Sequence, residues 1–133
     1  MANFIAKKLH FCRFLVFLQG YLAIAMKILV ITETDACCGP MAAAFLRDYS
    51  PSLEVVSAGR RPLESIDPMA VTVMKECLID LSDYQPKNAS DFDPSTFDAV
   101  YECPEQSCQN SMDAYRKLRD SIKNEAYLFF RNM

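Results

Sequence analysis

The chain has 133 residues, about the size of one domain, and 51% of them are hydrophobic against 23% that are charged. This is the composition of an ordinary globular domain with enough apolar side chains for a core. The net charge of −3 argues against nucleic acid as a partner. The six cysteines form no Cys-x-x-Cys pair and His10 is the single histidine, so we expect no metal site and no cofactor.

Residues 1–25 differ from the rest of the chain. Basic residues between Lys7 and Arg13 precede an apolar run from Phe14 to Ala25, and this order is typical of a secretory signal peptide. The run is shorter than the roughly 20 apolar residues that a membrane span needs. Contact with a membrane is therefore expected only if this segment is retained.

An upstream start codon is the alternative explanation of the same segment. Met26 stands where the first strand of the fold should begin, so it would be the natural start of a cytosolic protein. We therefore divide the chain into an N-terminal extension over 1–25 and a domain over 26–133. The expected location is the cytoplasm, or outside it if residues 1–25 act as a signal peptide.

The domain opens with a strand, a loop and a helix. The apolar run Ile28 to Ile31 is rich in β-branched residues and predicts a parallel strand that is buried on both faces. Gly39-Pro40 predicts a helix over about 40–48, because proline suits the first helical position. The eight residues between them would turn backbone N–H groups toward a helix N-terminus, which is the geometry of an anion cradle.

Strands and helices alternate along the rest of the domain. The elements predicted are a strand over 53–57, a helix from Asp67-Pro68, a strand over 97–102 and a helix over 111–131. Alternation of this kind indicates an α/β fold, a three-layer sandwich in which helices cover both sides of a short parallel sheet. We expect Arg60-Arg61 to be a surface turn and the basic residues of the last helix, including Arg116 and Arg119, to be a solvated face.

Four short motifs carry a resemblance to a known family. In chain order they are Val56-Ser57-Ala58-Gly59, Asp67-Pro68-Met69-Ala70, Ile79-Asp80-Leu81-Ser82 and Phe97-Asp98-Ala99-Val100. With the opening unit they resemble the low-molecular-weight protein-tyrosine phosphatases and their relatives, the thioredoxin-coupled arsenate reductases. The resemblance covers Met26 to Cys103 and implies the phosphotyrosine protein phosphatase I-like fold. The sheet of this chain would be truncated relative to the family by its fourth strand.

The resemblance also implies a chemistry. Active members carry a loop of the form Cys-x5-Arg-Ser/Thr-Pro, whose thiolate attacks phosphorus. Backbone amides and the arginine hold the oxyanions, and an aspartate on a later Asp-Pro loop protonates the leaving oxygen.

Matching Gly39-Pro40 to the end of that motif places Thr32 at the nucleophile position and Cys38 at the arginine position. Gly39 then takes the serine position and Asp35 that of a loop asparagine. The degenerate anion loop comprises Thr32, Glu33, Thr34, Asp35, Ala36, Cys37, Cys38 and Gly39. No cysteine of the chain is followed by arginine six positions on, so a shifted alignment cannot restore the motif.

The general-acid loop is also absent from the sequence. Its only candidates, Asp67-Pro68 and Asp93-Pro94, belong to earlier segments. The carboxylates of Glu33 and Asp35 should repel anions and raise the pKa of a nearby thiol. We therefore expect a phosphatase-like protein that lacks phosphatase activity, with weak binding of any oxyanion or phosphorylated ligand; whether it is an enzyme at all stays open.

Two alternatives remain. The arsenate reductases pair the loop cysteine with two more after the third strand, so the resemblance makes Cys37, Cys38, Cys103 and Cys108 candidates for thiol redox chemistry with a thioredoxin-type reductant. Against this, free cysteines are most often small core residues. The other alternative is a non-catalytic domain that binds a ligand or a partner through the altered loop.

Overall fold

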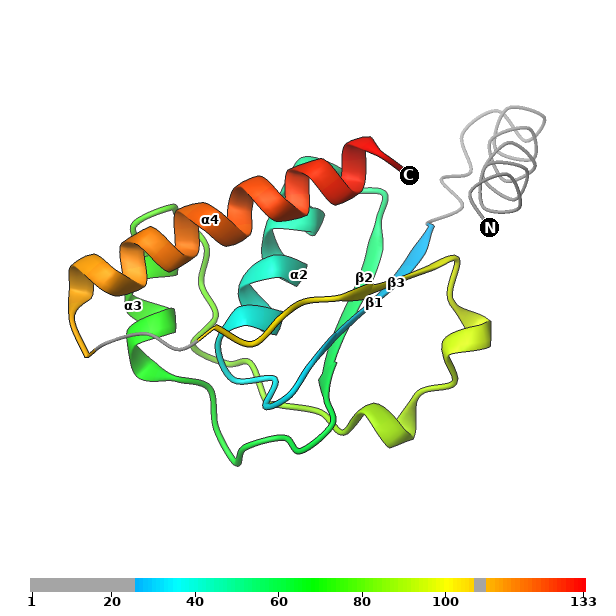
Figure 1. Cartoon of the computed structure of the whole chain (residues 1–133), viewed down its shortest axis with the longest axis horizontal. Coiled ribbons are helices and arrows are strands. Elements are labelled where there is room, and N and C mark those ends of the chain that lie inside the picture. The colour runs from blue at the N-terminus through cyan, green and yellow to red at the C-terminus, as the bar shows by residue number, and fades with distance from the viewer. Residues whose placement is uncertain (1–25, 107–109) are drawn as a thin grey trace.

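The computed structural model describes residues 26–106 and 110–133. Its elements are the strand β1 (Lys27–Thr32), the helix α2 (Cys38–Tyr49), β2 (Glu54–Gly59), α3 (Pro68–Lys75), the short 3₁₀ helices η1 (Ala89–Asp91) and η2 (Pro94–Thr96), β3 (Ala99–Glu102) and α4 (Met112–Arg131). Figure 1 shows them in place. The extension predicted over 1–25 lies outside the described residues. Within the described part, no helix is both long and apolar enough to cross a membrane.

The sheet has three parallel strands in the order β2-β1-β3, so β1 is the central strand. Ile28, Leu29 and Val30 are fully buried, as the apolar run predicted. Because the strands are parallel, their carboxyl ends meet at one edge of the sheet. Thr32 there lies opposite Gly59, and Ile31 lies opposite Glu102. The predicted α/β fold with a short parallel sheet is confirmed.

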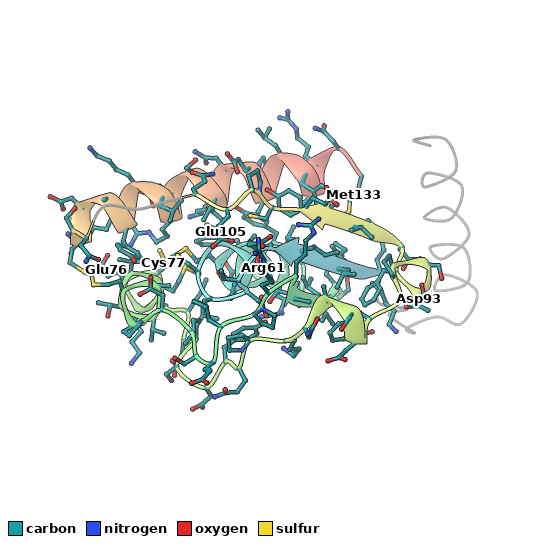
Figure 2. The ribbon with its side chains drawn as sticks, turned by 60° about the horizontal axis from the view of Figure 1, so that its bottom comes forward. Arg61, Glu76, Cys77, Asp93, Glu105 and Met133 are labelled. Atoms are coloured by element: carbon teal, nitrogen blue, oxygen red, sulfur yellow. The ribbon has the colours of Figure 1, made fainter. Side chains whose placement is uncertain are left out.

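The helices contact one another in the order α2–α4–α3, and α2 also packs on β1 and β2. The core therefore fills the space between the sheet and these helices. Its largest fully buried side chains include Phe45 and Met41 from α2, Met74 from α3 and Ile122 from α4. Figure 2 shows the side chains on the ribbon, with Arg61 and Glu105 at the middle of the view and Glu76 beside Cys77 at the end of α3. This packing fixes α2 with its first turn at the carboxyl edge of the sheet.

The structure corrects several predicted boundaries. Helix α2 begins at Cys38, before Gly39-Pro40, and the N–H of Met41 donates to the carbonyl oxygen of Cys37 over 3.2 Å. Pro40 still lies in the first turn, where its missing N–H is not needed. The loop after β1 therefore has five residues rather than eight. Strand β3 begins two residues later than predicted, because Phe97 caps the 3₁₀ helix η2.

The N-cap predicted at Asp67 is present, and the structure adds a second one at Ser111. The Asp67 side chain accepts a hydrogen bond from the Met69 N–H over 2.9 Å and begins α3. Ser111 does the same for α4 through the Ala114 N–H, over 3.1 Å. Each satisfies an N–H group that the helix itself leaves without a partner.

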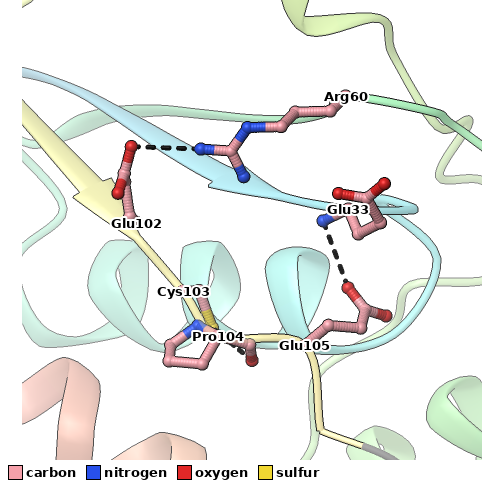
Figure 3. A pocket seen from close by; sticks show the side chains of 6 residues that line it. All are labelled: Glu33, Arg60, Glu102, Cys103, Pro104 and Glu105. Carbon is pink, nitrogen blue, oxygen red and sulfur yellow. Dashed lines mark hydrogen bonds and ion pairs between the residues drawn. The ribbon is translucent and has the colours of Figure 1, made fainter.

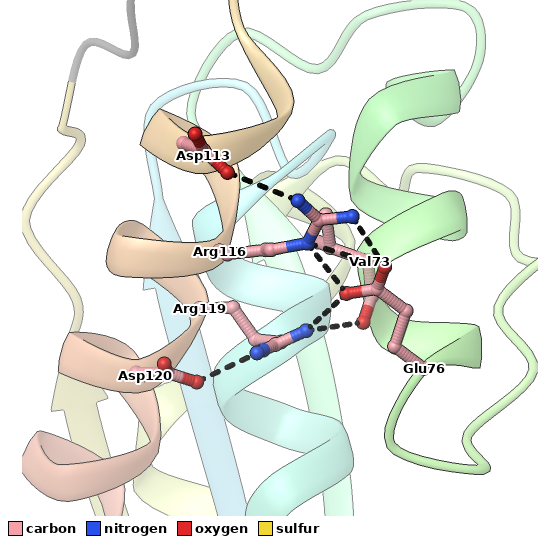
Figure 4. A network of polar contacts seen from close by, with 6 residues as sticks. All are labelled: Val73, Glu76, Asp113, Arg116, Arg119 and Asp120. Atoms are coloured by element: carbon pink, nitrogen blue, oxygen red, sulfur yellow. Dashed lines mark hydrogen bonds and ion pairs between the residues drawn. The ribbon is translucent and has the colours of Figure 1, made fainter.

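An ion-pair network joins α3 to α4 (Figure 4). The carboxylate of Glu76 accepts hydrogen bonds from the guanidinium groups of Arg116 and Arg119, and Arg119 also donates to the carbonyl oxygen of Val73. The prediction of a solvated face is wrong for Arg119, whose side chain is 12% exposed, whereas Arg116 is 41% exposed as well as paired. They hold the last helix against α3.

Candidate functional site

The candidate site is the loop Glu33–Cys37 at the carboxyl edge of the sheet, between β1 and α2. The segment after β2 runs alongside it. N–H groups of Arg60, Arg61 and Leu63 donate to the carbonyl oxygens of Thr32, Glu33 and Thr34 respectively, over 2.8 to 3.0 Å. This side-by-side pairing fixes the loop backbone. An anion cradle needs such a fixed backbone, because its N–H groups must point at the ligand in advance.

Thr32, which occupies the nucleophile position, is turned into the loop. Its side chain is 1% exposed, and its Oγ1 accepts a hydrogen bond from the Asp35 N–H over 3.1 Å. A Cβ added at Gly39 would lie 2.8 Å from that oxygen, which explains why this position holds glycine. The hydroxyl is therefore a structural acceptor.

Asp35 lies inside the molecule rather than at the loop mouth. Its φ is +51°, in the left-handed region, and its side chain is fully buried. Oδ2 accepts hydrogen bonds from the Tyr84 hydroxyl and from the Lys87 N–H, and Tyr84 also lies 2.5 Å from the Ser57 hydroxyl. Oδ1 is buried and has no hydrogen-bond partner in the part of the chain that the structure describes. The expectation that Asp35 faces an incoming anion is wrong.

Burial of this cluster changes its acid–base behaviour. Loss of solvation raises the pKa of Asp35, while the hydrogen bonds from Tyr84 and Lys87 oppose that rise. Burial also raises the pKa of Tyr84, and its hydrogen bond to Asp35 raises it further. The loop is thus supported from inside by a carboxyl group for which ionisation is costly.

A different carboxylate occupies the mouth of the loop. Oε2 of Glu105, three residues after β3, accepts from the Glu33 N–H over 3.2 Å, and Oε1 accepts from the Thr34 hydroxyl over 2.9 Å (Figure 3). The Glu33 carboxylate is paired with Arg61 at 2.5 Å, and Arg60 is paired with Glu102 at 3.1 Å. Arg60 and Arg61 therefore flank the loop, and their side chains are 51% and 86% exposed, in agreement with the predicted surface turn.

These side chains surround a shallow pocket of about 260 Å³. It is lined by Glu33, Arg60, Glu102, Cys103, Pro104 and Glu105. Three carboxylates against one guanidinium make it acidic, which opposes the binding of a further anion. Among residues 26–106 and 110–133, no group of three or more His, Cys, Asp or Glu side chains could hold a metal ion.

Cysteines lie beside the loop as well. Cys38 is fully buried in the first turn of α2, and a hydrogen bond with the Cys37 side chain lowers the pKa of its thiol. Burial raises the pKa of Cys103, at the end of β3, to about 12, and the negative charge of Cys38 adds to the rise. The prediction that Glu33 and Asp35 raise the pKa of a nearby thiol is wrong for Cys38, because its hydrogen bond with Cys37 outweighs the opposing effects of burial and of the Glu105 and Glu125 carboxylates. Cys108 lies outside the described residues.

Neither Asp-Pro aspartate is placed as a general acid. Oδ1 of Asp67 accepts from the Met69 N–H, and Oδ2 accepts from the Tyr115 hydroxyl over 2.5 Å. Asp93 caps η2 through the N–H of Ser95 over 3.0 Å. Both carboxylates serve to begin a helix.

Sequence reasoning found the loop and missed most of what surrounds it. Glu105 could have been found from topology, because the carboxyl ends of parallel strands meet and Glu105 follows one of them. Tyr84 gave no such signal, since it comes from an irregular segment that only the tertiary structure brings to β2.

Solved structures resemble this chain closely in fold. An arsenate reductase in its phosphate-binding state has a TM-score of 0.69 at 17% identity, covering 78% of this chain and 95% of its own. Wzb of Vibrio vulnificus in complex with benzylphosphonate has a TM-score of 0.70 at 18% identity, and the match covers 81% of this chain and 99% of Wzb. The low-molecular-weight protein tyrosine phosphatase of T. tengcongensis has a TM-score of 0.69 at 19% identity, and the match covers 82% of this chain and 100% of that phosphatase.

A comparison with curated protein sequences gives no match. The family model for low molecular weight phosphotyrosine protein phosphatase matches residues 27–128, which is most of the chain. That range begins at the first residue of β1 and reaches nearly to the end of α4. The chain belongs to the low-molecular-weight phosphotyrosine protein phosphatase family.

Proposed function

We propose that this chain is a family member that has lost phosphatase activity and acts as a non-catalytic domain. The observation that carries the proposal is the state of Thr32 at the end of β1. Its hydroxyl oxygen is buried and accepts a hydrogen bond from the loop, with no histidine, lysine or carboxylate among its hydrogen-bond partners. A hydroxyl nucleophile needs an adjacent base, and the described residues place none at hydrogen-bond distance from this one.

Charge around the loop supports the same proposal. Cys38 stands where active members have arginine, so the two hydrogen bonds of a bidentate guanidinium are lost. A hydrogen bond to a charged group contributes about 1.5–3 kcal/mol, so this loss would weaken anion binding by several powers of ten. Arg60 and Arg61 do not replace the missing guanidinium, because both are already paired with carboxylates.

The proposal is tested by assaying hydrolysis of p-nitrophenyl phosphate from pH 5 to 8. We expect the wild-type protein to show no turnover above background and to be indistinguishable from Thr32→Ala. Thr32→Ala is the matched control because it removes the hydroxyl at the nucleophile position. Turnover by the wild type that Thr32→Ala abolishes would overturn the proposal.

Thiol redox chemistry is the second candidate, favoured by the gathering of sulfur atoms at the carboxyl edge of the sheet. The N–H of Cys103 donates to the carbonyl oxygen of Ile31 over 2.9 Å, which places the end of β3 beside the loop that carries Cys37 and Cys38. The lowered pKa of Cys38 favours its thiolate, which is the reactive form. A peroxide would then oxidise two thiols to one disulfide with release of water, and a thioredoxin-type protein would reduce it again.

Mass spectrometry after mild peroxide treatment tests this second candidate. We expect a disulfide that joins Cys103 to Cys37 or to Cys108, which prior alkylation with iodoacetamide prevents. If every thiol can still be alkylated after the peroxide treatment, no disulfide has formed and the redox candidate fails.

A further inference from the structure

The mouth of the loop contains a carboxylate from the chain itself. The Glu105 carboxylate is held through both oxygens, by the backbone N–H of Glu33 and by the hydroxyl of Thr34. Glu33 directly follows the nucleophile position, so this N–H belongs to the backbone of the anion loop. We propose that these donors form a carboxylate or oxyanion site and that Glu105 fills this site in cis, as a built-in competitor.

The chain on either side of Glu105 is fixed in a way that suits this role. Before it, the N–H of Cys103 continues the pairing of β3 with β1 by donating to Ile31. After it, the carbonyl oxygen of Gln106 lies 4.0 Å from the Cys38 thiol. Pro104 restricts the backbone between these points. Glu105 is therefore presented to the loop by a short segment with a contact at each end.

Charge pairing explains how three carboxylates share so small a pocket. Arg61 neutralises Glu33, and Arg60 neutralises Glu102. Within residues 26–106 and 110–133, Glu105 forms no ion pair, and its carboxylate is held by the loop donors. If Glu105 were removed, the Glu33 N–H and the Thr34 hydroxyl would face solvent in the same positions, while the other two carboxylates would stay paired.

Glu105 has an advantage over a free anion because its carboxylate is covalently attached to the same chain as the loop. A group on a short tether acts at an effective concentration of about millimolar or more. A free anion that binds two neutral donors only weakly cannot displace it at ordinary concentrations. The inference rests on the proposed function, since an active loop would have to be open to its substrate.

The test compares Tm in sodium phosphate and in sodium chloride at matched ionic strength. For the wild type we expect the same Tm in both salts. For Glu105→Ala we expect phosphate to raise Tm in a saturable way, by roughly 5 °C once phosphate reaches about ten times its Kd. Glu105→Gln keeps an acceptor but loses the charge, so phosphate should raise its Tm less than that of Glu105→Ala. The same measurement on Glu105→Gln replaces the alanine variant if that variant fails to fold.

Glu64→Ala is the control, because it removes an exposed carboxylate of the β2–α3 connection and leaves the Arg60–Glu102 and Arg61–Glu33 pairs of the pocket intact. It should behave like the wild type. Three results would overturn the inference: an equal phosphate response in wild type and Glu105→Ala, no response in either Glu105 variant, or an equal response in Glu64→Ala. Hydrolysis by the wild type would instead refute the proposed loss of activity, so the two failures can be told apart.

Discussion

Asp35 shows how one residue can support the loop and weaken the fold together. Its carboxyl group satisfies the Tyr84 hydroxyl and the Lys87 N–H, but its second oxygen is buried without a donor. A buried unsatisfied polar atom costs about 1–3 kcal/mol. Asparagine keeps the accepting oxygen, carries no charge and tolerates the left-handed backbone.

We therefore predict that Asp35→Asn stabilises the protein at neutral pH, because the amide keeps the acceptor for Tyr84 and Lys87 without a buried charge. Because burial raises the pKa of Asp35 above its unfolded value, its contribution is most favourable below pH 4 and is lost as the pH rises through the folded pKa. The gain from Asp35→Asn should therefore increase with pH between 4 and 8.

Thermal unfolding at each pH measures this gain. Asp93→Asn is the control, because the pKa of Asp93 is lowered by its hydrogen bonds with Ser95. Its stabilising contribution is therefore lost as the pH falls rather than as it rises. A gain from Asp35→Asn that stays constant or shrinks with pH would show that the buried carboxyl group does not weaken the fold.

At the scale of elements, the contact between α3 and α4 depends on a charge pattern that neither helix shows alone. Arg116 and Arg119 are three residues apart, so they share a face of α4. Glu76 caps the C-terminus of α3, and its carboxylate accepts hydrogen bonds from both arginines. The sequence alone predicts that arginines on one helix face are solvated, because it does not show that a carboxylate from another helix pairs with them.

We predict that Glu76→Gln lowers Tm at pH 7 and low salt. Hydrogen bonds from Arg116, then Arg119, lower the pKa of Glu76 to about 2, so its contribution is present above the unfolded pKa and is lost as the pH falls toward 2. The difference in Tm should therefore shrink between pH 5 and pH 3, and also in 1 M sodium chloride. Glu64→Gln, on an exposed residue of the β2–α3 connection, should show neither dependence.

At the scale of the whole molecule, the fold could be predicted because each local signal agrees with it. The apolar run of β1, the Asp67 cap of α3 and the alternation of strands and helices all point to one architecture. The site could be predicted only in part. The sequence shows that the nucleophile and the guanidinium are missing, at Thr32 and Cys38. The burial of Asp35 and the contact of Glu105 with the loop depend on segments that are far away in the sequence.

The strand order also predicts an order of folding. β1 pairs with β2 across a single helix, but with β3 only after most of the chain has been made. Closing the longer loop costs more entropy, so the β1–α2–β2 unit should form first. We predict that Val55→Ala in β2 slows folding, whereas Tyr101→Ala in β3 mainly speeds unfolding.

Stopped-flow folding and unfolding in urea tests this order. Each variant should lose at least about 1 kcal/mol, which is enough for a reliable comparison of the two rates. Equal φ-values at Val55 and Tyr101 would mean that the whole sheet forms in one step.

This order has a consequence for newly made chains. Glu105 reaches the loop only when β3 has joined the sheet, because the segment that presents it starts at the end of that strand. A chain on which β3 has not yet docked has the backbone of the anion loop in place without its built-in carboxylate. We therefore expect the loop to be open to external anions on a chain whose β3 has not yet docked, and closed to them once Glu105 is in place.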